Sequence, residues 1–227
     1  MGITSLALLA LLTLLVVFSG KEAVPILVFV LRPGAMRYSF DDSFASQELI
    51  SKSSALHDWL HRLQELGFFL LGVKVEKLPL WGRAYREVAL VSQEAETYAS
   101  IVLHGDGSPA SLYFYTPFQS GGMVFTRNYA PASEAESERL SVKNVPTQNF
   151  KEILESHEYR LRVFKERGLV PLAGFSQQAR IEATRAFYAS EYARRPGQLV
   201  LSPSVLGFYV SLLLLLGAAY WFAIASR

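Results

Sequence analysis

The sequence predicts an α+β membrane protein, with two transmembrane helices flanking a soluble domain. Three observations support this class. Residues 1–20 and 196–226 carry no charged side chain, all charges except Arg227 lie between these runs, and that middle segment mixes two-residue alternation with helical apolar stripes. We expect a roughly five-stranded antiparallel sheet with three helices on one face. The predicted divisions are residues 1–31, 32–198 and 199–227.

Composition limits the chemistry that is open to the chain. It has 227 residues, no cysteine and a net charge of +2. Disulfides, thiolate metal sites and cysteine nucleophiles are therefore excluded, and a small net charge does not favour nucleic acid as a partner. The sequence also lacks a P-loop, a G-x-G-x-x-G fingerprint and a G-x-S-x-G elbow, so we expect no cofactor.

The N-terminal apolar run allows two interpretations. A cleaved signal peptide would use residues 17–19 as its cleavage site, but no Lys or Arg precedes the apolar core, which favours a retained transmembrane helix. This helix either continues to about residue 31 with a kink near Pro25, or ends earlier and leaves residues 26–31 as a buried strand. The longer helix would measure roughly 43 Å, more than the bilayer core requires.

The C-terminal run is the clearer transmembrane helix. Ser202 and Pro203 are typical of a helix start, and residues 205–225 follow without a charge. Aromatic residues lie near both ends, and the amphipathic Tyr and Trp among them suit the two membrane interfaces. These aromatic residues are Phe208, Tyr209, Tyr220 and Trp221.

Basic residues suggest how the chain is oriented. Two spans place both termini on one side of the membrane and the domain on the other. On the domain side, close to the spans, lie Lys21, Arg32, Arg37, Arg185, Arg194 and Arg195, against only Arg227 beyond them. The positive-inside rule then predicts a cytoplasmic domain, and we expect a bacterial cytoplasmic membrane.

The first part of the domain predicts one helix followed by a meander. Residues 38–52 are polar and predict a loop or a short helix, and residues 53–67 predict a helix with one apolar face. Glycine-rich turns at residues 105–107 and 120–122 separate candidate strands, as in hairpins. The five predicted strands are residues 68–75, 85–92, 97–104, 111–118 and 123–129.

The second part of the domain predicts two helices after a linker. Residues 130–145 are acidic and rich in Pro, Ser and Ala, and predict an exposed linker. A long helix begins at Pro146 or Asn149 and ends near Arg167. A last helix covers about residues 176–195 and ends at a Pro-Gly pair. Its arginines, Arg180 among them, predict either a segment facing lipid headgroups or an ordinary charged helix.

Histidines are the weak candidates for chemistry. His57 and His61 are four residues apart on one helix face, which is half of a two-histidine metal site. No third ligand is apparent, and two surface histidines explain the spacing more simply. His157 lies in an apolar stripe, where a packed histidine is favoured over a catalytic base. We therefore assign no catalytic, cofactor or metal site.

These observations order three functional hypotheses. The first is a non-catalytic, membrane-integrated accessory subunit that stabilises a larger membrane complex, with respiratory or photosynthetic assemblies as possible settings. Its partners would be other integral membrane subunits and the lipid bilayer, with no nucleic acid. The second is a membrane-anchored ligand-binding or sensory protein. The third is a membrane-bound enzyme that uses His57 and His61 or His157.

Overall fold

A computed structural model of the chain describes residues 3–43, 48, 53–129, 134–189 and 202–225. Its contacts divide the chain into two compact units. We call them the helix-pair unit (Met1–Arg37, Lys77–Ala84 and Arg194–Arg227) and the sheet unit (Tyr38–Glu76 and Tyr85–Ala193). The α+β class is confirmed, because an apolar helix near each end of the sequence flanks a segment that forms a sheet.

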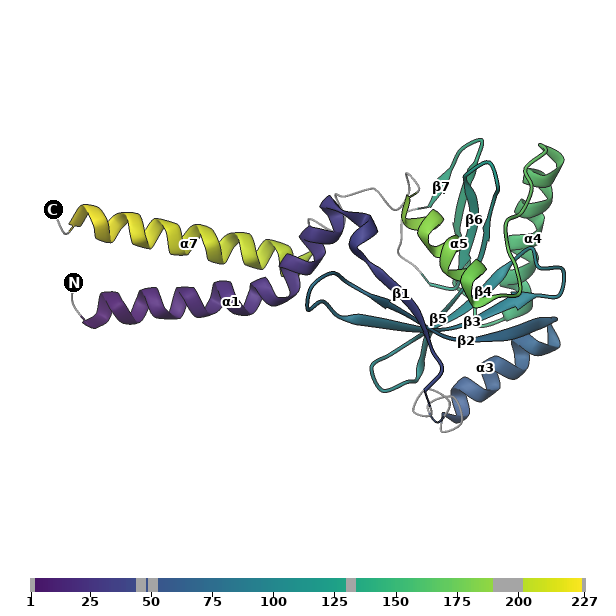
Figure 1. Ribbon diagram of the computed structural model, residues 1–227, viewed down its shortest axis with the longest axis horizontal. Helices are drawn as coiled ribbons and strands as arrows, with labels where there is room; N and C mark the ends of the chain where they lie inside the picture. Colours follow the sequence, from purple (N-terminus) through teal and green to yellow (C-terminus); the bar gives the residue numbers. More distant parts are fainter. Residues whose placement is uncertain (1–2, 44–47, 49–52, 130–133, 190–201, 226–227) are drawn as a thin grey trace. The chain divides into compact units, whose positions relative to one another are not determined.

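The helix-pair unit is built on α1 (Ile3–Leu31) and α7 (Pro203–Ala225), with a short 3-10 turn, η1 (Pro33–Ala35). The two long helices pack side by side, and their chain-terminal ends lie at the same end of the pair (Figure 1). Each is long and apolar enough to cross a membrane. α7 begins at Pro203 as predicted, but the Ser202 hydroxyl has no partner among the described residues and does not cap it.

α1 continues without a break through Pro25, which confirms the longer of the two predicted helices and excludes a strand at residues 26–31. Figure 1 shows α1 changing direction in its later half, as a proline within a helix predicts. Ala23, Pro25 and Phe29 are buried in this part of the helix. The part of α1 beyond residue 20 is therefore partly buried within the chain, although its last residue, Leu31, is 81% exposed.

The sheet has eight strands among the described residues, not five as predicted, in the order β1-β2-β3-β4-β5-β6-β8-β7. The five predicted strands are present as β2 to β6, and the prediction missed β1, β7 and β8. The bounds are β1 Arg37–Asp41, β2 Phe68–Lys77, β3 Ala84–Ser92, β4 Tyr98–Leu103, β5 Pro109–Pro117, β6 Met123–Arg127, β7 Ala135–Glu136 and β8 Leu140–Asn144.

Two segments that were predicted as loops contain strands. β1 lies within the segment predicted as a loop or short helix, and β7 and β8 lie within the predicted linker. β8 pairs with β6 in parallel, so the sheet is not purely antiparallel. Gly122 permits this pairing, because a Cβ at that position would lie 2.1 Å from the carbonyl oxygen of Arg139, just before β8. Ser141 and Val142 of β8 are consequently buried.

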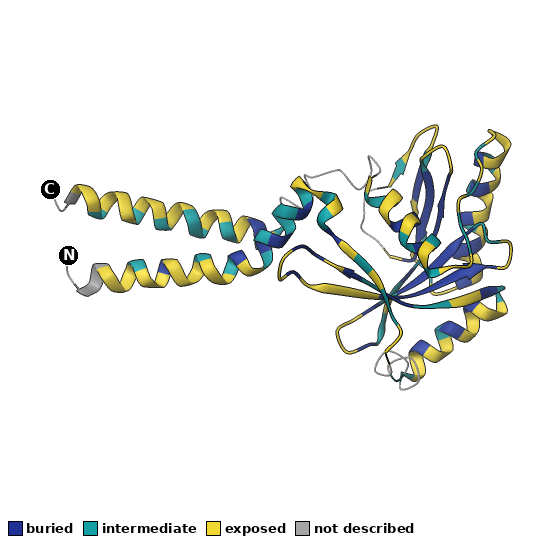
Figure 2. Cartoon of the chain, in the orientation of Figure 1, coloured by how far each residue is buried: buried dark blue, intermediate teal, exposed yellow. Residues whose placement is uncertain are grey.

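Helices cover both faces of the sheet, whereas the sequence predicted one covered face. α3 (Ser54–Glu65) and α4 (Phe150–Glu166) pack on the face that carries Leu90, Ile101 and Phe114, which we call the α3/α4 face. α5 (Gln177–Ala189) packs on the opposite face, the α5 face, against Tyr98 and Tyr115. Figure 2 shows the central strands buried between these helices. The predicted continuation of α5 to residue 195 lies outside the described residues.

Candidate functional site

His57 and His61, the weak metal-ligand candidates, are exposed on α3. The Nδ1 atom of His61 is 3.4 Å from a carboxylate oxygen of Glu65, one helical turn away. Among the described residues, no group of three or more His, Cys, Asp or Glu side chains is placed to hold a metal ion. The structure thus brings no third ligand to this histidine pair.

His157 is fully buried between α4 and the sheet, within a chain of polar side chains. Its Nε2 lies 3.0 Å from the hydroxyl of Thr116, and its Nδ1 lies 2.9 Å from the hydroxyl of Thr126. Thr116 continues the chain to Thr97 at 2.8 Å, and Arg160 donates to Thr126 at 2.8 Å. The hydroxyl of Thr126 thus bonds both Arg160 and the His157 ring, since a hydroxyl has one donor and two acceptor positions.

This environment keeps the His157 imidazole neutral. Burial, followed by the nearby Arg160 charge, lowers the pKa of His157 to about 3. Both ring nitrogens already have partners, and the side chain has no exposed surface. The His157 side chain is therefore packed between α4 and the sheet, with both ring nitrogens hydrogen-bonded.

The strongest polar cluster in the sheet unit was missed by sequence reasoning. Lys74, Glu87 and Arg180 meet between the sheet and α5, and each is at most 7% exposed. The Glu87 carboxylate accepts from Lys74 Nζ at 2.7 Å and from an Arg180 terminal nitrogen at 2.8 Å. Arg180 is therefore neither a headgroup-facing residue nor part of an ordinary solvated helix face, as its place in the sequence had suggested.

Neutral and acidic neighbours complete this cluster, which we call the buried charge network. Arg180 also donates to the hydroxyls of Ser100 at 3.0 Å and Tyr113 at 2.9 Å. Lys74 donates to Glu76 at 2.6 Å, and Glu76 accepts from the Tyr188 hydroxyl at 2.6 Å. Two acids thus balance two bases, and the network has no net charge.

Backbone geometry of β2 positions two of these charges. Phe68 packs on the α3/α4 face, and regular alternation would place Lys74 and Glu76 on that same face. Gly72 interrupts the alternation with φ +129°, a conformation that favours glycine, and the charges beyond it reach the α5 face. A lone glycine inside an apolar strand, followed by charges two residues apart, was the available sequence signal.

Electrostatics within the network favour the ionised forms. Burial alone would raise the pKa of Glu87, but Lys74 and Arg180 outweigh burial and lower it. Burial, reinforced by Glu87, raises the pKa of Tyr113 far above its usual range, so its phenol stays protonated. The Nε atom of Arg180 is buried without a hydrogen-bond partner. The remaining polar contacts of the network are internal and join α5 to β2 and β3 of the sheet.

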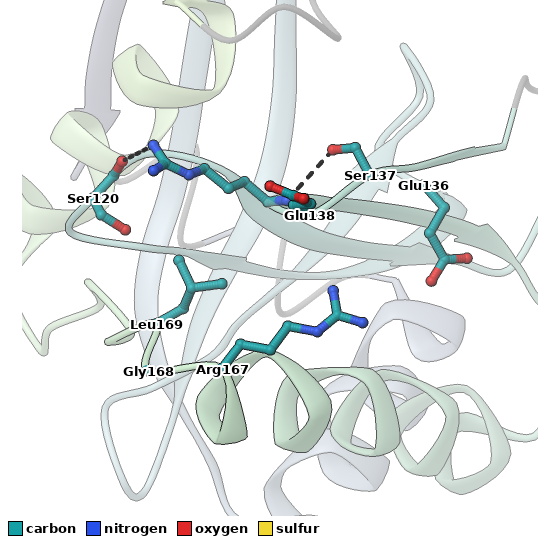
Figure 3. A pocket seen from close by; sticks show the side chains of 8 residues that line it. Ser120, Glu136, Ser137, Glu138, Arg167, Gly168 and Leu169 are labelled. Carbon is teal, nitrogen blue, oxygen red and sulfur yellow. Dashed lines mark hydrogen bonds between the residues drawn. The ribbon is translucent and has the colours of Figure 1, made fainter.

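A hollow of about 820 Å³ lies at the C-terminal end of α4, beside the turn after β5 and the segment that joins β7 to β8 (Figure 3). Glu136, Glu138, Arg139 and Arg167 are exposed around it, so its charges balance. Arg139 donates to the carbonyl of Ser120 at 3.5 Å. Charged side chains that remain in water interact weakly, and the two glutamates are not part of any group of three or more potential metal ligands among the described residues.

A second polar cluster joins three segments of the helix-pair unit. The Glu22 carboxylate of α1 accepts hydrogen bonds from Arg83, in the β2–β3 loop, and from the Ser204 hydroxyl of α7 at 2.9 Å. In the same loop, Trp81 donates its indole N–H to the carbonyl of Lys21 at 3.1 Å. These bonds tie the loop and the start of α7 to α1 directly after its charge-free part.

The β2–β3 loop presents apolar side chains outward. Leu80 has φ +60°, a left-handed conformation that costs roughly 1–2 kcal/mol for a residue with a Cβ. Gly82 permits close packing beneath it, because a Cβ there would lie 2.4 Å from Leu78 Cβ and 2.9 Å from Pro25 Cβ. Leu80 and Trp81 are 57% and 62% exposed as a result.

No protein family, curated protein or solved structure matches the chain. The functional assignment therefore depends on the geometry of these residues alone.

Proposed function

We propose that this chain is a non-catalytic accessory subunit of a larger membrane complex. In this proposal α1 and α7 cross the bilayer and pack against other integral membrane subunits, and the sheet unit is the folded part outside the bilayer. The observation that carries the proposal is the apolar surface that the helix pair leaves uncovered.

That surface is extensive on both helices. Only 6% of the most apolar part of α7 is buried within this chain, against 22% for α1. Apolar patches of more than a few hundred Å² on a protein mark contacts with lipid or with other proteins. The large exposed apolar side chains are Leu6, Leu8, Leu11, Leu14, Leu15, Val17, Phe18 and Leu31 on α1, and Leu206, Tyr209, Val210, Leu213, Leu214, Leu216, Tyr220, Trp221 and Ile224 on α7.

The polar chemistry of the sheet unit supports a structural role. Both ring nitrogens of His157 are hydrogen-bonded to threonine hydroxyls. In the buried charge network, the Glu87 carboxylate forms ion pairs with Lys74 and Arg180. Catalytic groups, by contrast, need reacting atoms within reach and a place for substrate. The alternatives of a sensory protein or an enzyme lack a comparable supporting observation among the described residues.

The proposed orientation follows from the basic residues near the spans. Lys21, Arg32 and Arg37 follow the charge-free part of α1, so the sheet unit is assigned to the cytoplasmic side and both termini to the other. The natural absence of cysteine gives a direct test. A single cysteine at exposed Tyr159 should resist a membrane-impermeant maleimide in intact cells and react after lysis. Labelling in intact cells would reverse the assignment.

Mild detergent extraction followed by native electrophoresis tests the accessory role. We expect the chain to migrate together with other membrane proteins, well above the position of a monomer. Replacing exposed Leu213, Leu216 and Tyr220 of α7 by alanine should release it from that assembly, because packing drives association between transmembrane helices. Alanine at the half-buried Leu212 and Leu215 serves as the control. A lone monomer in the unmodified protein would contradict the proposal.

A further inference from the structure

A groove on the helix-pair unit is not used by the proposed function. Its volume is about 630 Å³, within the range of roughly 300–1,000 Å³ that ligand sites occupy. We call it the helix-pair groove, and every residue that lines it belongs to this one compact unit. The residues that matter here are Val16, Gly20, Lys21 and Val24 of α1, Trp81 of the β2–β3 loop and Phe208 of α7.

The groove lies where the charge-free part of α1 ends. Val16 and Gly20 belong to that part, and Lys21 is the first charged residue after it. Gly20 leaves room beside α7, because a Cβ there would lie 3.3 Å from the ring of Phe208. Apart from the Lys21 ammonium and the Trp81 N–H, the side chains that line the groove are hydrocarbon.

Charge at the rim of the groove is positive. Glu22 is engaged by Arg83 and Ser204, so these two residues offset its carboxylate. The ammonium of Lys21 lies 5.1 Å from the ring centre of Phe18 and makes no ion pair with a described residue. A cation therefore stands beside an apolar groove, with the amphipathic ring of Trp81 next to it.

We propose that the helix-pair groove binds one anionic phospholipid, with an acyl chain along its apolar lining and the headgroup phosphate at Lys21. The inference rests on the proposed function, because it requires α1 and α7 to lie in a bilayer. Long basic side chains at the end of a span reach headgroups in this way, and Trp is enriched at the same depth. Anionic headgroups are favoured because each basic residue near the membrane surface adds to their binding.

Two single-tryptophan forms of the full chain make the test specific. One keeps Trp81, in the groove, and the other keeps Trp221, near the far end of α7, with the remaining tryptophans replaced by phenylalanine. Each is reconstituted in phosphatidylcholine vesicles that contain, at equal mole fraction, either brominated phosphatidylglycerol or brominated phosphatidylcholine. Bromine quenches indole fluorescence only at close range, so the quenching reports which lipid lies beside each tryptophan.

We expect brominated phosphatidylglycerol to occupy the Trp81 site with about fivefold preference over brominated phosphatidylcholine. Trp221 should be quenched equally by the two lipids. Lys21→Glu should abolish the preference at Trp81, and Val24→Phe should reduce quenching there by either lipid, because it fills the groove. Arg32→Glu, with the same charge change about 16 Å farther along the helix direction, should leave the preference intact.

The outcomes separate the two proposals. Equal quenching of Trp81 by both lipids, or a preference that survives Lys21→Glu, overturns the phospholipid site while quenching of Trp221 still places the helix pair in the bilayer. Absence of quenching at both tryptophans contradicts the bilayer location, and the groove proposal fails with it.

Discussion

In the sheet unit, most large apolar side chains are buried between the strands and the helices on both faces, whereas in the helix-pair unit the same residue types on α1 and α7 face outward (Figure 2). Charges show the opposite contrast. The sheet unit encloses Lys74, Glu87 and Arg180, while Glu22 and Arg83 of the helix-pair unit remain 42% and 72% exposed.

This contrast separates a part of the chain that completes its own core from a part that requires an outside surface. A sheet covered by helices on both faces satisfies its apolar residues internally. The two long helices, with the β2–β3 loop and η1 against part of α1, leave most of their apolar residues uncovered within the chain. This exposed apolar surface is why the proposed contacts with lipid and partner subunits lie on the helix pair.

The largest expected effect comes from breaking the buried charge network. Arg180→Met removes the donor shared by Glu87, Ser100 and Tyr113, and should lower the free energy of unfolding by about 3–5 kcal/mol. Urea unfolding in detergent measures the loss, followed by the fluorescence of Trp59 in a full-length chain whose Trp81 and Trp221 are replaced by phenylalanine. Arg185→Met, on the exposed side of the same helix, should change it by no more than about 0.5 kcal/mol. Equal losses would mean that the network does not hold α5.

A charge placed on α7 should act on membrane insertion rather than on folding. Leu214→Arg should disfavour insertion by roughly 2.5–3.5 kcal/mol, seen as a lower fraction retained by membranes after alkaline carbonate treatment. Leu172→Arg, at a residue of similar exposure in the sheet unit (45% against 56%), should leave retention unchanged. Similar retention of the two variants would contradict the proposal that α7, and not the sheet unit, is inserted in the membrane.

Acidification should weaken the sheet unit through His157. In the unfolded chain this histidine takes up a proton near pH 6.5, whereas in the folded chain its lowered pKa delays protonation until about pH 3. The unfolded state thus binds more protons, so this stability is present above pH 6.5 and is lost as pH falls. Between pH 6.5 and 4.5 the loss should be roughly 2–3 kcal/mol. In His157→Asn the corresponding part of the pH dependence should vanish, and an unchanged slope would contradict the buried neutral histidine.

The smallest effect should come from the exposed ion pair. Arg83→Gln removes the salt bridge to Glu22, but both side chains are well solvated and Ser204 remains bonded to the same carboxylate. We expect a change of less than about 1 kcal/mol in the free energy of unfolding, measured as for Arg180→Met. A loss as large as that of Arg180→Met would show that the two charge clusters are equivalent.

Local patterns account for the elements that the sequence predicted correctly. Ser53, at the start of the first predicted helix, and Asn149, one of the two predicted starts of the next, each accept a backbone hydrogen bond as a cap. Gly107 and Gly121 adopt positive φ in the predicted hairpin turns. Each of these features depends on residues a few positions apart. The same holds for the apolar stripes of α3 and α4 and for the two charge-free ends.

Features set by distant residues were not predictable. β8 is a short, polar strand whose burial comes from parallel pairing with β6 and from the space that Gly122 leaves. Arg180 looked like a surface residue because its partner Glu87 is 93 positions away in the sequence. No pattern among neighbouring residues predicts that two charges so far apart in the sequence will form an ion pair inside the core.

Site-specific photocrosslinking in native membranes tests the accessory role most directly. A diazirine residue at Leu213, which is 68% exposed on α7, should form an adduct with another membrane protein. The same residue at Val205, which is fully buried within this chain, should form none. Adducts with lipid alone at Leu213, at every exposed position of α1 and α7 tested, would contradict a membrane complex held by these helices.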